Sequence, residues 1–179
     1  MKSRSALYIV SIMAVSILLA SCSPAATPVV TDAVGSASIV DNATAFEKAI
    51  GTTGTWIIAI TKDLTIDKDL VLEGDFKNGK KDTDGKDLLQ RKIALYAQDA
   101  DRNITARYTL SAKSLTIKSA VASIQHGTFK GDLYVDVVGF QLIDAKVEGN
   151  IYFQSDAIKA SFVMDATSSV TGVQEVKAS

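Results

Sequence analysis

The chain has 179 residues, of which 47% are hydrophobic, and its 19 basic side chains nearly balance 20 acidic ones. This balance argues against nucleic-acid binding, which needs a basic excess. The sequence holds one cysteine and one histidine. That count excludes a disulfide framework and the usual multi-histidine metal site.

Residues 1–21 have the order of a secretory leader. Lys2 and Arg4 lie at its start, an uncharged apolar run follows over residues 6–20, and small residues precede Cys22, the sole cysteine. A basic region, an apolar region of this length and a small-residue exit are typical of a signal peptide. A membrane-spanning helix needs about 20 apolar residues, more than this run contains.

The sequence Leu19-Ala20-Ser21-Cys22 resembles the bacterial lipobox, in which a leucine and two small residues precede a lipidated cysteine. The resemblance implies cleavage before Cys22 and a lipid on its thiol. Acyl chains such as palmitate would then anchor the domain outside the cytoplasm, since each buried methylene contributes about 0.8 kcal/mol. Ser23 favours the outer membrane, or the outer face of the cell membrane in a single-membrane cell, over the inner membrane. Ordinary secretion and an uncleaved anchor are the alternatives.

A tether and a short helix are predicted to follow the leader. Residues 22–38 contain both prolines and many small residues, which predicts a flexible tether ahead of a folded domain at residues 39–179. Asn42 or Thr44 can then serve as a helix N-cap, and Gly51 can end the helix. So short a helix is marginal alone, and we expect it to cap one end of the core.

Short β-rich runs separated by polar corners follow this helix. Between them, residues 75–92 contain ten charged side chains in eighteen positions, which predicts an exposed excursion. The end of the chain predicts a last irregular coil and a frayed tail. The expected strands lie at residues 56–60, 64–66, 70–72, 93–96 and 104–110, the expected corners at 61–63 and 67–69, and the expected last coil and tail at 162–164 and 169–179.

The stretch over residues 111–154 repeats itself at a spacing of 18 residues. Residues 129–135 match residues 147–153 position by position, and residues 115–117 lie 18 positions earlier. A period of this size, made of short strands, is typical of a solenoid in which each coil buries its face against the next. The same period relates a second set of apolar residues, namely Ile124, Leu142 and Ala160.

The sequence therefore predicts an all-β fold, a single-stranded right-handed parallel β-helix with a short N-terminal capping α-helix. A left-handed hexapeptide helix also has 18-residue coils, but its glycine-led hexads are missing. Gly-Asp-Leu-Tyr-Val at residues 131–135 and Glu-Gly-Asn-Ile-Tyr-Phe at residues 148–153 resemble the repeats of bactofilins, which are polymer-forming cytoskeletal β-helices. The helix at residues 46–50 with the following Trp-Ile-Ile strand resembles the first coil of pectate-lyase-like β-helices.

Stacking residues 18 apart also assigns the faces of the strands. Thr116, Tyr134 and Tyr152 would form an outward column, a candidate binding surface for a sugar ring or a partner strand. The alternative is a ladder of β-favouring residues that shields the sheet. The inward side chains would be Leu115, Ile117, Leu133, Val135, Ile151 and Phe153.

The same register stacks two pairs of opposite charges, Lys118 over Asp136 and Lys130 over Glu148. Such pairs fix the register of neighbouring strands. These charges therefore indicate a structural role rather than a catalytic one.

Two further groups of polar residues carry weaker signals. His126 would stack near Asp144, which is one component of a general-base arrangement, but no activated serine or cysteine is indicated nearby, so we expect a structural or solvated pair. Residues 82–87 resemble part of a calcium loop but lack a third alternating ligand and a closing glutamate. A mobile charged loop is therefore expected, with no metal.

The predicted function is that of a membrane-anchored cell-envelope lipoprotein, a non-enzymatic β-solenoid that serves as a scaffold or adhesion module. Its partners would be membrane lipid through Cys22 and an envelope glycan or protein, with no nucleic acid, cofactor or catalytic residue. One alternative is a small carbohydrate-active β-helix, binding or cleaving polysaccharide with acidic residues near Asp132. Another alternative is a bactofilin-like polymer former.

Overall fold

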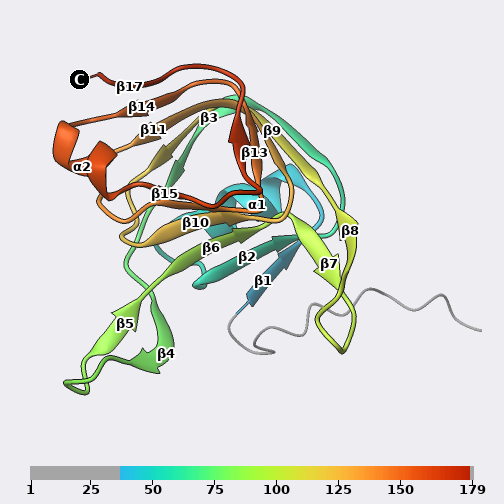
Figure 1. Ribbon diagram of the computed structural model, residues 1–179. Coiled ribbons are helices and arrows are strands. Elements are labelled where there is room, and N and C mark those ends of the chain that lie inside the picture. Colours follow the sequence, from blue (N-terminus) through green and yellow to red (C-terminus); the bar gives the residue numbers. More distant parts are fainter. Residues whose placement is uncertain (1–36, 178–179) are drawn as a thin grey trace, which may run out of the picture.

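The structure, a computed structural model, describes residues 37–177. Strands predominate, and the helices in this part of the chain are α1 (Ala43–Ile50) and α2 (Asp156–Ser161). Figure 1 shows the strands gathered in two layers, from which two hairpins project. The all-β prediction is confirmed.

The first layer is a six-stranded sheet, sheet A, in which every neighbouring pair is parallel. Parallel strands cannot be joined by tight turns, so the chain leaves the sheet after nearly every strand and returns later. In spatial order its strands are β1 (Ala37–Val40), β2 (Ile57–Ile60), β6 (Arg91–Ala94), β10 (Ala122–Gln125), β12 (Gln141–Ile143) and β15 (Val163–Met164).

The second layer, sheet B, has seven strands, and its pairs are parallel as well. From β2 onward the chain alternates between the two sheets, whereas β1 and β2 of sheet A are joined through α1 (Figure 1). The strands of sheet B are β3 (Leu64–Leu72), β9 (Thr109–Ile117), β11 (Thr128–Val135), β13 (Lys146–Glu148), β14 (Ile151–Phe153), β16 (Ser169–Val170) and β17 (Gln174–Val176).

The register confirms the 18-residue spacing within the repeat. Leu133 pairs with Leu115 on one side and with Ile151 on the other, and Ile124 pairs with Leu142. The extension of this series to Ala160 is wrong, because the helix α2 is inserted at that point. The strand β15 follows α2, and its Met164 takes the place beside Leu142.

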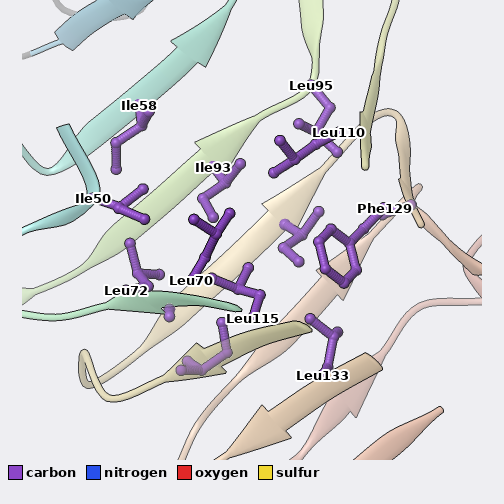
Figure 2. Close-up of a cluster of buried hydrophobic side chains, with 14 of the residues drawn as sticks. Ile50, Ile58, Leu70, Leu72, Ile93, Leu95, Leu110, Leu115, Phe129 and Leu133 are labelled. Carbon is purple, nitrogen blue, oxygen red and sulfur yellow. The ribbon is translucent and has the colours of Figure 1, made fainter. Parts of the chain in front are cut away.

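The main hydrophobic core lies between the two sheets and draws residues from both (Figure 2). Burying each large aliphatic or aromatic side chain contributes about 1.5–3 kcal/mol. The predicted inward side chains all belong to this core, each with an exposed fraction of 0%: Leu115, Ile117, Leu133, Val135, Ile151 and Phe153.

The capping helix forms where the sequence predicts it. The Asn42 side chain accepts a hydrogen bond of 2.9 Å from the backbone N–H of Ala45, and Gly51 ends the helix. Phe46 and Ile50 lie one turn apart and are buried in the main core. The helix therefore covers the N-terminal end of the core, beside β1, β2 and β3.

The predicted corner at residues 67–69 is wrong, because β3 runs unbroken through it. Between Ile66 and Asp69, β3 is longer than the facing part of β9, and the register of the pair shifts there. The Asp69 carboxylate accepts a hydrogen bond of 2.6 Å from the Ser114 hydroxyl at this point. The polar run thus marks a bulge within a strand, which bends the strand without ending it.

The charged excursion is a hairpin formed by the antiparallel strands β4 (Lys77–Lys81) and β5 (Asp87–Leu89), which projects from the sheets (Figure 1). Its predicted end at residue 92 is too late. Arg91 and Lys92 belong to β6 and are buried. Local charge density predicts exposure correctly for the hairpin and wrongly for these two residues.

A second hairpin, which the sequence did not predict, joins β7 (Tyr96–Gln98) to β8 (Ile104–Arg107). It covers part of the outer face of sheet A and creates a small second core there. This arrangement explains why all four residues of β2 are buried, since neighbouring strand residues point to opposite faces. The second core contains Ile57, Ala59, Ala94 and Tyr96, with Ala37, Trp56 and Ile104 packed against it.

Paired strands extend further toward both ends of the chain than predicted. The strand β1 begins at Ala37, inside the expected tether. The expected frayed tail is instead strand β17, whose Val176 still pairs with Phe153. Sheet B therefore continues as paired strands almost to the C-terminal end of the described residues, whereas sheet A ends at β15.

Candidate functional site

The predicted outward column forms on the second sheet. Tyr134 pairs in register with Thr116 on one side and Tyr152 on the other, and Val71 and Glu175 extend the column at its two ends. All five side chains, here called the tyrosine column, are partly or fully exposed. The column is thus a continuous strip across five strands.

The tyrosine rings cover one another. The ring centroids of Tyr134 and Tyr152 are 5.2 Å apart, with a tilt of 31° between the ring planes. The Lys177 ammonium lies 4.7 Å from the centroid of Tyr152, and the strand order places it on the side away from Tyr134. The column therefore presents ring edges and hydroxyls outward, a geometry that favours a shielding ladder over a stacking platform for sugars.

A ladder of polar side chains joins the strands at the bulge. The Asp132 carboxylate accepts hydrogen bonds of 2.9 and 3.0 Å from the backbone and side-chain nitrogens of Asn150. The Asn150 oxygen in turn accepts one of 3.0 Å from the backbone N–H of Val173. Asp132, the acidic residue considered for polysaccharide chemistry, thus holds the neighbouring strand connection in place.

Glycines lie beside this ladder because the backbones approach too closely for a side chain. A Cβ atom on Gly149 would lie 2.0 Å from the carbonyl oxygen of Gly131, and one on Gly131 would lie 2.3 Å from that of Ala112. Glycine alone tolerates such approaches. The Gly-Asp and Gly-Asn pairs at matching repeat positions are the sequence signal that indicates this ladder.

His126 and Asp144 lie side by side, as their spacing predicts. The imidazole Nδ1 is 3.0 Å from Oδ2 of Asp144, and a guanidinium nitrogen of Arg107 donates to the same oxygen. The ring of Tyr96 meets the imidazole edge-on, with the centroids 4.6 Å apart. His126 and Asp144 each follow a strand and adopt left-handed backbone, with φ of 59° and 47°.

His126, Asp144 and Arg107 form a cluster, here called the corner cluster, that joins neighbouring strand connections. The hydrogen bonds from His126 and then from Arg107 lower the pKa of the Asp144 carboxyl below its usual range. The two bonds thus hold the charged carboxylate in place between His126 and Arg107. A hollow of about 460 Å³ lies beside the cluster and is lined by Arg107, Gly127, Thr128, Asp144, Ala145, Lys146, Thr167 and Ser169.

Asp144→Asn is expected to lower the free energy of unfolding by about 1 kcal/mol at pH 7. The substitution removes the negative charge to which His126 and Arg107 bind, and the effect is modest because these side chains are partly exposed. Asparagine keeps the shape and tolerates left-handed backbone. Since the folded-state pKa is depressed, the stabilisation is present above the usual aspartate range and is lost as the pH falls through the lowered pKa.

Urea unfolding at pH 7 and at about pH 3 checks this dependence, with Asp101→Asn as an exposed control expected to change stability by less than about 0.5 kcal/mol. A stability difference between Asp144→Asn and the unaltered protein that is equally large at both pH values would contradict it.

One of the two predicted charge pairs is present. Lys130 Nζ lies 3.0 Å from Glu148 Oε2, which confirms that prediction, and Lys146 lies 2.8 Å from the other oxygen. Bonds from Lys146 and then Lys130 lower the pKa of Glu148. The pairing of Lys118 with Asp136 is wrong: both lie just beyond the ends of β9 and β11, and no ion pair between them occurs in the described chain.

Arg91 is the largest fully buried side chain among the described residues. One guanidinium nitrogen donates to the carbonyl oxygens of Ala49 at 2.7 Å and Gly51 at 3.0 Å, and the guanidinium lies 3.8 Å from the ring centroid of Phe76. Its Nε and Nη1 atoms have no hydrogen-bond partner within the described chain. Burial lowers the pKa of Arg91 to about 10, so the buried group is charged at neutral pH.

The calcium-like residues 82–87 form the turn of the first hairpin. The Asp82 carboxylate accepts hydrogen bonds from the backbone N–H groups of Asp84 at 2.9 Å and Lys86 at 2.8 Å, and Asp87 pairs with two lysines of β4. These carboxylates therefore organise the turn. Within residues 37–177, no group of three or more His, Cys, Asp or Glu side chains could hold a metal ion.

Cys22 and the leader lie outside the described residues, so the predicted lipidation site has no structural counterpart here. No helix within residues 37–177 is long and apolar enough to span a membrane.

The chain matches no protein-family model, no curated protein and no solved structure. Its class is accordingly defined by the fold: an all-β protein built on parallel sheets.

Proposed function

We propose that the protein is a cell-envelope lipoprotein: a right-handed parallel β-helix, anchored to the membrane through Cys22, that serves as a non-enzymatic scaffold or adhesion module. The β-helix is supported by the alternation of the chain between two parallel sheets around one main core. The in-register pairing of residues 18 apart supports it as well. A crystal structure with a left-handed coil would contradict this part of the proposal.

The observation that carries the scaffold role is the use of polar side chains outside the main core. His126 with Asp144, Lys130 with Glu148, and Asp132 with Asn150 each join neighbouring connections or strands of the stack. Side chains engaged in this way hold a regular surface rigid. A rigid surface keeps the tyrosine column in a fixed arrangement. The ring edges and hydroxyl groups of the column would then contact an envelope glycan or protein.

The proposed location at the membrane rests on the leader. Its basic start, apolar run and terminal Leu-Ala-Ser-Cys sequence resemble those of a lipoprotein signal. Acylation of the single cysteine would then connect the domain to the membrane surface.

Intact-mass analysis of the full-length product from bacterial membranes tests the proposal. We expect a mass that corresponds to cleavage before Cys22 plus a diacylglyceryl group and, in cells that acylate the new N-terminus, a further acyl chain. Cys22→Ala should lose the lipid mass and the membrane association. A soluble, unlipidated product from the unaltered sequence would overturn the lipoprotein proposal and favour the cytoskeletal alternative.

A further inference from the structure

The two ends of the main core are closed differently. At the N-terminal end, α1 packs Phe46 and Ile50 onto the core, and every inward side chain of β3 has an exposed fraction of at most 5%. At the C-terminal end, Phe162 stacks on Phe140 with the ring centroids 5.7 Å apart and packs at a tilt of 50° against Phe153, with the centroids 5.3 Å apart. The strands β15 and β17 lie beside this aromatic plug.

These last strands carry inward side chains that remain exposed. Met164 pairs in register with buried Leu142, and Val176 pairs with buried Phe153. The register thus directs both toward the core side of their sheets, yet they are 40% and 37% exposed. The reason is that no strand follows β15 or β17 in its sheet among the described residues, and covering such apolar surface is favourable.

The strand β17 also offers its backbone. One edge pairs with β14, and within residues 37–177 no strand pairs with the other edge. In β17 the carbonyl oxygen of Gln174 accepts a hydrogen bond of 2.8 Å from Lys159 Nζ of α2. An edge with unpaired N–H and C=O groups is a template for a further strand. A helix lies beside the end strands at both ends, but the longer α1 packs its buried Phe46 and Ile50 against the core beside β1 and β3, whereas α2 beside β17 buries only Ile158.

The charges on β17 indicate which strand fits this edge. Glu175 and Lys177 flank Val176 and share the outer face, since Glu175 pairs in register with Tyr152 and Lys177 lies over the same ring. If a second β17 ran antiparallel and were centred on Val176, Glu175 would face Lys177 of the other copy. The twofold symmetry produces this favourable cross-strand pair twice.

We propose that two copies of the chain associate through their C-terminal edges, with β17 antiparallel to β17 about a twofold axis at Val176. The contact buries the exposed valines against each other and pairs the open backbone edge. Because it is isologous, it closes at a dimer and does not propagate into a filament. This inference goes beyond the proposed function and does not depend on lipidation.

Oxidant-induced cysteine cross-linking of the detergent-extracted full-length chain tests the geometry. Directly opposed residues of an antiparallel pair have Cα atoms about 4.5–5.5 Å apart, within the range that a disulfide spans. Val176→Cys is therefore expected to give a species of twice the monomer mass on a non-reducing gel. Val138→Cys, whose native side chain is 57% exposed in the connection between β11 and β12, is the control and should give no more dimer than the unaltered chain.

A charge exchange tests the pairing. Sedimentation of the detergent-extracted full chain should show a dimer whose dissociation constant rises about tenfold in Glu175→Lys, because like charges then face each other. Adding Lys177→Glu to the same chain should restore the original value. Thermal unfolding establishes that each variant is folded, and Lys177→Glu alone provides the same test if Glu175→Lys fails to fold.

Equal cross-linking at positions 176 and 138 would overturn the proposal, as would a monomer at all concentrations. A loss of affinity that the double variant does not restore would overturn the antiparallel register. Species larger than a dimer in sedimentation would contradict a closed contact and indicate end-to-end assembly.

Discussion

Gly149→Ala is expected to lower the free energy of unfolding by about 3 kcal/mol, one of the largest effects of any single methyl group in this protein. The added Cβ would lie 2.0 Å from the carbonyl oxygen of Gly131 and 2.6 Å from its carbonyl carbon. Both contacts are with backbone, so no side-chain rotation relieves them. The backbone cannot move freely either, because Asp132 holds Asn150 through two hydrogen bonds.

Urea unfolding of the two variants Gly149→Ala and Gly51→Ala isolates the steric cause. Gly149 is not among the described glycines with positive φ, so its replacement tests space alone. At Gly51, which has φ of −77°, the nearest atom to a new Cβ is 3.6 Å away, and the expected change is within about 0.5 kcal/mol. Similar losses of stability in both variants would show that the close approach of the strand connections is not what requires glycine.

The sequence predicted best the parts of the fold in which residues at a regular spacing along the chain contact each other. Parallel strands in register place residues 18 apart beside each other, so Leu133 meets Ile151 and His126 meets Asp144. The pattern needed only the local alternation of apolar and polar residues. It failed at Ala160, where α2 adds residues between two strands and shifts the register.

The parts that were missed depend on contacts that local pattern does not encode. The run Ile57-Ile58-Ala59-Ile60 is buried on both faces because the β7–β8 hairpin covers one of them. A continuous apolar run indicates such double burial, but it does not identify the covering segment.

Arg91 is the clearest example among the polar residues. It follows the charged hairpin directly in sequence, which predicted exposure, whereas its partners are the end of α1 and the ring of Phe76. The candidate site shows the same limit, since spacing predicted the tyrosine column but not the tilt of 31° by which its rings cover each other.

Arg91→Ala is expected to lower the free energy of unfolding by about 3 kcal/mol, because it leaves a cavity beside Phe76 and removes the donor to the carbonyl oxygens of Ala49 and Gly51. Exposed Lys62→Ala is the control, with an expected change within about 0.5 kcal/mol.

Arg91→Met separates packing from charge. Methionine fills most of the volume and removes a buried charge whose Nε and Nη1 atoms are unpaired, so the loss should fall to about 1 kcal/mol. Urea unfolding gives both values, and hydrogen exchange should show the amides of α1 less protected in both variants than in the unaltered protein. An equal loss in the alanine and methionine variants would mean that the two carbonyl bonds, rather than the packing, hold α1 on the end of the core. A loss with no change in α1 protection would mean that Arg91 stabilises β6 alone and does not attach the capping helix.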